Sequence, residues 1–141
     1  NKERYHKIDF GIPVTAAQLC KQNDIPSFLV ISAMGANKSS AIFYNKTKGE
    51  MEEAVLEAGI EQTHILRPAL ITGNREESRR GERVAQFLFQ GIDWLMIGPL
   101  KKYRSVPAIK IAKAMIHLSK FPADHSIINS AQIHQIAKQK R

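Results

Sequence analysis

The chain has 141 residues, 43% of them hydrophobic and 24% charged, and a formal net charge of +8 at pH 7. This length allows one domain with a buried core, and the composition is ordinary for a soluble globular protein. No apolar stretch is long enough to cross a bilayer, and the polar opening segment 1–7 does not look like a signal peptide. We therefore expect a cytoplasmic location and no membrane partner.

The cysteine content points to the same compartment. Cys20 is the only cysteine, so an internal disulfide is excluded and a reducing environment is expected. Cys20 lies among apolar residues, which favours a core thiol over a nucleophile. Because residue 1 is not Met, we expect a fragment or a processed chain.

The positive charge is gathered in patches, and the pI is near 9.8. Such patches occur in nucleic-acid-binding proteins, but no zinc spacing or RNA-recognition pattern accompanies them. Solvated helix faces and loops are therefore favoured over nucleic-acid binding. The patches are Arg75, Arg79, Arg80 and Arg83; Lys101, Lys102 and Arg104; and Lys138, Lys140 and Arg141.

The first half of the chain reads as alternating helices and strands. A helix over 11–23 is expected, with Asp9 as its cap and Pro13 in its first turn. An apolar strand over 27–32 follows, and then a helix from about 40 to 58 with Gly59 just beyond its end.

The second half continues this alternation. A second strand is expected near 62–67, where Pro68 would end the hydrogen-bond ladder because it lacks an N–H. The later expected elements are a polar loop over 72–78, a helix over 79–90, a strand over 94–97, a helix capped by Ser105 with Pro107 in its first turn, a strand at 127–128 and a last helix capped by Ser130.

Strand, helix and strand in this order indicate a parallel sheet in an α/β fold. Ligands of such sheets bind at the carboxyl ends of the strands, and Ser32 stands at one of these ends. Tyr44 and Lys48 follow on the next helix, one turn apart. An ammonium beside a phenol lowers the pKa of the phenol, so the three side chains could bind and protonate a carbonyl.

The Tyr44 and Lys48 pair is weak evidence when taken alone, because the chain has three tyrosines and many lysines. The alternative is a solvated helix face that carries Lys46 and Lys48, with Tyr44 packed at its edge; the strand and loop before the pair and the strand after it favour the site. A second difficulty is the absence of a Gly-rich turn after a first strand, which a dinucleotide-binding domain needs for its phosphates. We therefore expect residues 1–141 to be a single-domain fragment, the carboxyl-terminal portion of a Rossmann-like doubly wound parallel sheet with helical substrate-side elements.

Several segments, taken in order, resemble the short-chain dehydrogenase/reductase superfamily, in its atypical branch and most of all the Tat-interacting-protein oxidoreductases. The resemblance covers about residues 8–137. The segments that carry it are Phe28-Leu29-Val30-Ile31-Ser32, Gly35-Ala36-Asn37-Lys38-Ser39-Ser40, Tyr44-Asn45-Lys46-Thr47-Lys48-Gly49-Glu50, Leu66-Arg67-Pro68-Ala69-Leu70, Asn74-Arg75-Glu76-Glu77-Ser78-Arg79, Gly81-Glu82 and Ser105-Val106-Pro107.

The resemblance implies an NAD(P)-dependent oxidoreductase that reduces a small carbonyl compound. Tyr44 would donate the proton, Lys48 would lower the pKa of the Tyr44 phenol and bind the nicotinamide ribose, and Ser32 would complete the catalytic set. Ser32, Tyr44 and Lys48 would also bind the cofactor, together with Arg67, Pro68 and Leu70. The implied cofactor is NAD(P), with NADP slightly favoured, and an oligomer is compatible with the sequence.

One departure leaves an alternative open. Members of this superfamily often have two serines at this strand end, and here the second position is Ala33. Ser32 then either takes the catalytic role or faces the cofactor only through its backbone. The alternative is a catalytically weak NAD(P)-binding sensor or scaffold that acts through partners.

Other residues give weaker signals. Arg75 and Arg79 fit either contacts to an anionic substrate or a surface helix entry, and the latter is favoured. His64 fits a hydrogen-bonded core histidine better than an acid or base. The spacing of the sequence predicts no metal site.

Overall fold

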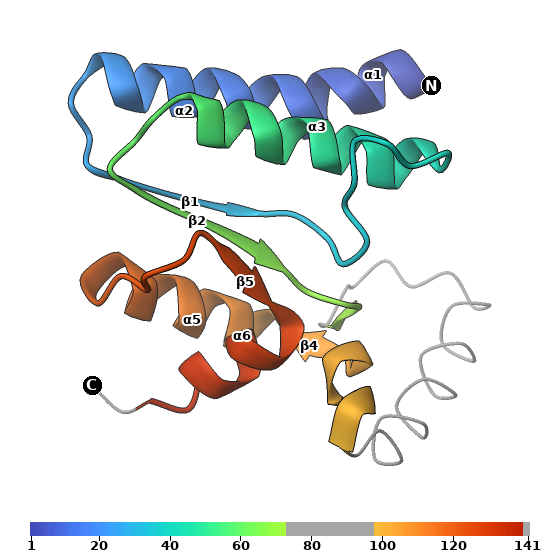
Figure 1. Ribbon diagram of the computed structural model, residues 1–141, viewed down its shortest axis with the longest axis vertical. Coiled ribbons are helices and arrows are strands. Elements are labelled where there is room, and N and C mark those ends of the chain that lie inside the picture. The colour runs from blue at the N-terminus through green and yellow to red at the C-terminus, as the bar shows by residue number, and fades with distance from the viewer. Residues whose placement is uncertain (73–97, 140–141) are drawn as a thin grey trace.

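The computed structural model describes residues 1–72 and 98–139, and these residues form three layers (Figure 1). A small parallel sheet lies between a helical layer built from the first half of the chain and a second helical layer built from its end. The predicted α/β class is confirmed. The elements are α1 (Lys2–His6), η1 (Lys7–Gly11), α2 (Ile12–Gln22), β1 (Ser27–Ile31), α3 (Phe43–Glu57), β2 (Gln62–Arg67), β3 (Ile71–Thr72), η2 (Gly98–Tyr103), β4 (Val106–Pro107), α5 (Ala108–Lys120), β5 (Ile127–Asn129) and α6 (Ser130–Ile136).

The main sheet has the order β1-β2-β5, and both of its pairings are parallel. The predicted strands near 27–32, 62–67 and 127–128 are confirmed, because each is an apolar run short enough to be a buried strand. A second, two-residue pairing joins β3 to β4. Thr72, predicted to open a polar loop, belongs instead to β3, since its partner strand lies more than thirty residues away and left no local signal.

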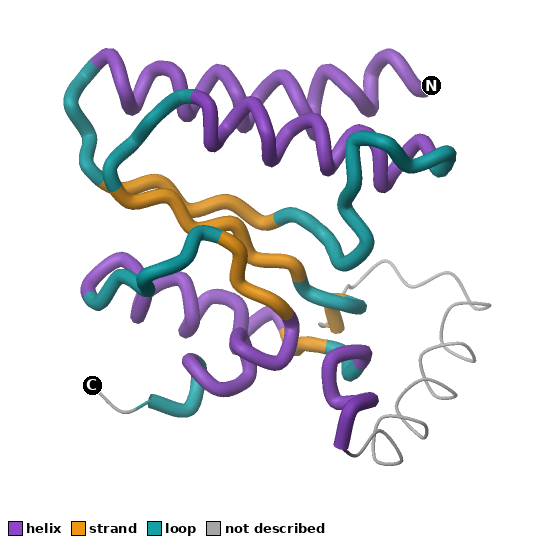
Figure 2. Tube along the Cα trace, viewed as in Figure 1, coloured by secondary structure: helices purple, strands orange, loops and turns teal. Residues whose placement is uncertain are grey.

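The N-terminal helix starts earlier than predicted. Asn1 caps it by accepting a hydrogen bond from the N–H of Glu3 at 3.1 Å, and the chain stays helical from Lys2 to Gln22 through a π-helical turn, η1 (Figure 2). Asp9, predicted as the cap, lies inside this turn. The prediction was wrong because the polar residues at the start show no apolar periodicity.

The helix α3 packs on the sheet beside α2. It begins at Phe43 rather than near Ser40, because the Ser40 hydroxyl accepts a hydrogen bond from the N–H of Ile42 and holds a turn there. Gly59 has a φ of +69° just after the helix, as its predicted position requires. One core cluster lies between these helices and the sheet; its buried members are Val14, Ala17, Met51, Val55, Ile60 and Ile65.

The C-terminal layer consists of α5 and α6, which cover the other face of the sheet (Figure 1). Asn129, rather than the predicted Ser130, caps α6 in a capping box with Gln132. At the start of α5, Pro107 occupies the cap position that was expected for Ser105, and Val106 and Pro107 form β4. The second core cluster lies here and comprises Leu66, Val106, Ile111, Ala114, Leu118, Ile128 and Ile133. The helix predicted over 79–90, the strand over 94–97 and Arg75 and Arg79 lie outside the described residues.

Candidate functional site

The N-terminal helix brings two polar side chains to α3. Tyr5 lies beside the predicted Tyr44, with ring centroids 5.9 Å apart, and also 5.8 Å from the ring of Phe43. Burial, followed by the negative charge of Asp9 and the neighbouring Tyr44, raises the pKa of Tyr5 to about 12. Tyr5 is therefore a neutral phenol at physiological pH.

Lys48 is paired with a residue that the sequence did not indicate. Its Nζ lies 2.8 Å from Oδ1 of Asp9, and the Lys48 side chain is only 11% exposed. The π-helical turn carries Asp9, and such turns are frequent at functional sites. The positive charge of Lys48 is thus compensated by Asp9, while Tyr44, one turn earlier on α3, is 44% exposed.

Ser32 stands at the carboxyl end of β1, as predicted. Its N–H donates to the carbonyl of Leu66 at 2.8 Å and extends the parallel ladder to β2. The Ser32 side chain is buried, and its hydroxyl has no hydrogen-bond partner among the described residues. A buried hydroxyl that forms no hydrogen bond costs roughly 1–3 kcal/mol.

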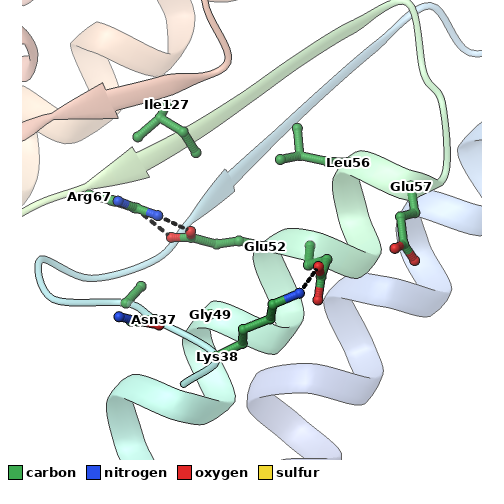
Figure 3. Close-up of a pocket in the computed structure, with 10 residues that line it drawn as sticks. Asn37, Lys38, Gly49, Glu52, Leu56, Glu57, Arg67 and Ile127 are labelled. Atoms are coloured by element: carbon green, nitrogen blue, oxygen red, sulfur yellow. Dashed lines mark hydrogen bonds and ion pairs between the residues drawn. The ribbon is translucent and has the colours of Figure 1, made fainter. Parts of the chain in front are cut away.

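Arg67, at the end of β2, is engaged with α3. Its Nε donates to Oε1 of Glu52 at 2.9 Å, and a second bond joins the guanidinium to Oε2, so that the two side chains point toward one another (Figure 3). The Glu52 side chain is only 5% exposed. These bonds to Glu52 raise the pKa of Arg67. The fork-shaped pair fastens the strand end to the helix that carries Tyr44 and Lys48.

The remaining predicted residues lie close along the chain. Pro68 is buried, and its carbonyl accepts a hydrogen bond from the N–H of Met34 at 2.9 Å, which ties the loop after β1 to the loop after β2. Leu70 is 44% exposed, and its carbonyl accepts from the N–H of Val106 at 2.7 Å. Both residues therefore contact neighbouring segments through their backbone carbonyls.

A pocket of about 710 Å³ adjoins this region (Figure 3). Of the predicted site residues, Arg67 alone is among those that line it. The loop after β1 forms one wall and touches α3 so closely that a Cβ at Gly49 would lie 2.2 Å from the backbone nitrogen of Lys38. An ion pair between Lys38 and Glu53 lies on the same side. Figure 3 labels Asn37, Lys38, Gly49, Glu52, Leu56, Glu57, Arg67 and Ile127 around the pocket.

Sequence reasoning missed Asp9 and Glu52 as site residues. Glu52 had a usable signal: a carboxylate beside the apolar positions Met51 and Val55 of a helix needs a cationic partner. Asp9 had none, because Lys48 lies 39 positions later in the chain. His64 is buried as expected, and its Nδ1 lies 3.3 Å from the carbonyl oxygen of His125.

Two absences hold for residues 1–72 and 98–139. In that part of the chain, no helix is both long and apolar enough to cross a bilayer. Nor do three or more His, Cys, Asp or Glu residues come together there in a way that could hold a metal ion. Cys20 is a free, half-buried thiol on α2.

Several known proteins are similar to this chain. No family model matches it. It is 33% identical over 122 residues to "Protein FMP52, mitochondrial" of Debaryomyces hansenii, covering 85% of this chain and 53% of that protein. The corresponding Aspergillus fumigatus protein is 37% identical over 115 residues, covering 82% and 49%. "Protein FMP52-2, mitochondrial" of Scheffersomyces stipitis is 30% identical over 145 residues, covering 96% and 62%. The chain thus spans about half the length of these relatives.

These relatives correct several predictions. The assignment to the short-chain dehydrogenase/reductase superfamily, near the Tat-interacting-protein oxidoreductases, is wrong, because the similar proteins are named FMP52. The predicted NAD(P)-dependent reduction of a carbonyl compound is likewise overturned, because the names of these relatives describe no oxidoreductase. The cytoplasmic location is also wrong, since the relatives are named as mitochondrial proteins. The assignment was wrong because it relied on short motifs, such as Tyr44-x-x-x-Lys48, that are common to many α/β proteins.

Proposed function

We propose that this chain is part of a mitochondrial protein that binds a dinucleotide of the NAD(P) type at the carboxyl ends of β1 and β2. The proposal concerns binding alone. The observation that carries it is the buried Ser32 hydroxyl, which has no hydrogen-bond partner among the described residues and lies at the edge where parallel sheets bind their ligands. A ribose hydroxyl or an amide of the ligand would give Ser32 the hydrogen bond that it lacks.

The neighbouring charges fit the same ligand. An ammonium has three N–H donors, so Lys48 retains two donors after it has bonded to Asp9. The Arg67 and Glu52 pair keeps the end of β2 in place against α3. When bound, the dinucleotide would contribute its ribose hydroxyls and nicotinamide amide to this edge, and Ser32 and Lys48 would hold them.

A second part of the binding site would come from residues beyond this chain. The sequence has no Gly-rich turn of the kind that cradles a pyrophosphate. Among the described residues, β1 pairs only with β2, so its other edge is open to a further strand. The relatives are about twice as long as the matched region, which leaves room for such a strand and turn.

The binding test uses the full-length protein that contains this chain. Nicotinamide fluorescence would be followed as the protein is added to NADH or NADPH. We expect saturable binding that Ser32→Ala weakens about fivefold, the value of one hydrogen bond. Ser119→Ala, an exposed serine on α5, is the matched control and should bind as the wild type does. Failure to bind either dinucleotide, or equal affinities of both variants, would refute the proposal.

The location is tested separately. A fluorescent protein fused to the end of the full-length chain should colocalise with a mitochondrial marker. A diffuse cytoplasmic signal would exclude the mitochondrial part of the proposal and leave the binding part standing.

A further inference from the structure

A second pocket, of about 410 Å³, lies in the C-terminal layer on the side of α5 that faces away from the sheet core. Residues from the second half of α5 and from the end of α6 line it. It is separate from the dinucleotide edge, since no residue lines both this pocket and the one beside Arg67. Its volume is within the range that holds a small organic ligand.

The pocket has an apolar floor that the fold does not use. Ile116 is 49% exposed and Phe121 is 60% exposed, although both are large apolar side chains. Beside them, Ile136 packs partly against the C-terminal core. Full burial of a side chain of this size stabilises by about 1.5–3 kcal/mol, so a ligand that covers Ile116 and Phe121 gains a substantial part of its affinity there.

The rim of the pocket is cationic. Lys113 and Lys120 lie two turns apart on α5, and Lys138 follows α6; all three are exposed. Within residues 1–72 and 98–139, no acidic side chain lines the pocket and no carboxylate forms an ion pair with these lysines. Their long stems can lie along the apolar floor while the ammonium groups remain at its border.

His134 on α6 lies near Lys138, and its pKa is lowered. Burial, and then the positive charges of Lys110, Arg104 and Lys138, lower the pKa of His134. A hydrogen bond that His134 Nε2 donates to the backbone carbonyl of Ser105 acts in the opposite direction.

We propose that this pocket binds a single-chain anionic amphiphile, with its alkyl chain on Ile116 and Phe121 and its carboxylate or phosphate head among Lys113, Lys120 and Lys138. The apolar floor argues against a simple inorganic anion, and the lysines argue against an uncharged hydrocarbon. Because the floor is hollowed between two helices, it fits one alkyl chain better than the flat surface of a bilayer.

The test is calorimetric titration of the protein with dodecyl phosphate below its critical micelle concentration. We expect binding of one molecule per chain, at least tenfold tighter than that of inorganic phosphate or dodecyl maltoside. Equal affinity for inorganic phosphate would overturn the role of the apolar floor. Equal affinity for dodecyl maltoside would overturn the role of the lysines. Binding to anionic vesicles without binding of the monomeric amphiphile would replace the proposal with a membrane-surface site.

Two double variants locate the site. Lys113→Glu with Lys120→Glu should weaken binding of dodecyl phosphate at least tenfold. Arg4→Glu with Lys7→Glu makes the same change in net charge at exposed positions of the opposite layer, and it should leave the affinity unchanged. Equal losses in both would show a non-specific charge effect and refute the site. Ile116→Ser is a third variant that keeps the charge, and unaltered affinity in it would also contradict the proposal. Circular dichroism would verify that each variant is folded.

Discussion

The two helical layers bury different kinds of side chains against the same sheet. The N-terminal layer (α1, η1, α2 and α3) encloses the Lys48 and Asp9 pair and covers most of the Glu52 carboxylate that binds Arg67. The buried core of the C-terminal layer (α5 and α6) is apolar. Strand β2 serves both layers, because side chains alternate along a strand: Ile65 belongs to one cluster and Leu66 to the other.

The two layers therefore differ in what their buried side chains contribute. An apolar cluster contributes through area and packing, and it tolerates no unpaired charge. The N-terminal layer accepts the buried charges of Lys48 and Glu52 because each has a partner on a neighbouring element. In the C-terminal layer Lys113, Lys120 and Lys138 lie on the outside, around the pocket of α5, and the buried Ser130 hydroxyl donates to the carbonyl of Arg104.

The largest effect should come from the apolar core of the C-terminal layer. Leu118 is 1% exposed, so Leu118→Ala removes buried methyl groups and leaves a cavity. We expect a loss of about 2–5 kcal/mol in the free energy of unfolding, measured by urea denaturation. Ile109→Ala, at a 62% exposed position of the same helix, is the control and should change little. A small loss in Leu118→Ala would mean that this layer is not the stabilising one.

The ion pair of the N-terminal layer should follow. Arg67→Ala leaves Glu52 buried without a partner, and we expect a loss of about 2–3 kcal/mol, below the range for a fully buried pair because the Arg67 side chain is one third exposed. Arg67→Met combined with Glu52→Leu should recover most of this loss, since no unpaired charge is then buried. If the double variant is no more stable than Arg67→Ala, uncompensated charge is not the cause.

Two glycines give a matched pair within the N-terminal layer. A Cβ at Gly49 would overlap the backbone of Asn37 and Lys38, so Gly49→Ala should destabilise by roughly 1–3 kcal/mol. Gly11 has helical φ and ψ and open space around it, so Gly11→Ala should stabilise by about 0.5–1 kcal/mol. Thermal unfolding of both variants measures the contrast. If the close approach of the backbone at Gly49 causes the loss, the two substitutions must change the stability in opposite directions. Changes of the same sign would mean that the loss of glycine itself is responsible.

The smallest expected effect concerns the dependence of stability on pH. Burial lowers the pKa of His64 from its ordinary value of 6.5, despite the hydrogen bond to His125. As the pH falls, His64 therefore takes up a proton in the unfolded chain before it does so in the folded chain. The contribution of His64 to the free energy of unfolding is complete above pH 6.5 and is lost as the pH falls through the lower pKa of the folded state. Urea midpoints measured from pH 8 to pH 5 should decline less in His64→Leu than in the wild type. His117→Gln is the control. If the urea midpoint of His64→Leu declines as steeply with pH as that of the wild type, His64 is not a source of the pH dependence.

Much of the fold could be predicted from local patterns. The apolar runs at 27–32 and 62–67 and the helical spacing around Met51 are properties of adjacent residues, and they gave the parallel sheet and α3. The β3 and β4 pairing and the partner of Lys48 could not be predicted, because they depend on segments that meet only in the folded chain. The choice of Asn129 over Ser130 as a cap was also beyond the sequence, since both are good caps and stand side by side.

The candidate site was predicted in part. Ser32 lies at the strand end and Tyr44 and Lys48 lie on the following helix, as their spacing indicates. The spacing did not reveal that Lys48 binds Asp9 or that Arg67 binds Glu52, because an ion pair leaves no pattern when its members lie on different elements. The dinucleotide itself stays a prediction.

The π-helical turn η1 sets the phase of the N-terminal helix. It fits one residue more into its turn than an α-helix would, so deleting one residue between 7 and 11 would let the helix continue as a regular α-helix. Everything before the deletion would then rotate by about 100° around the axis relative to Val14 and Ala17, which stay in the core. Tyr5 would leave the ring of Tyr44, so a single extra position determines which side of this helix faces α3.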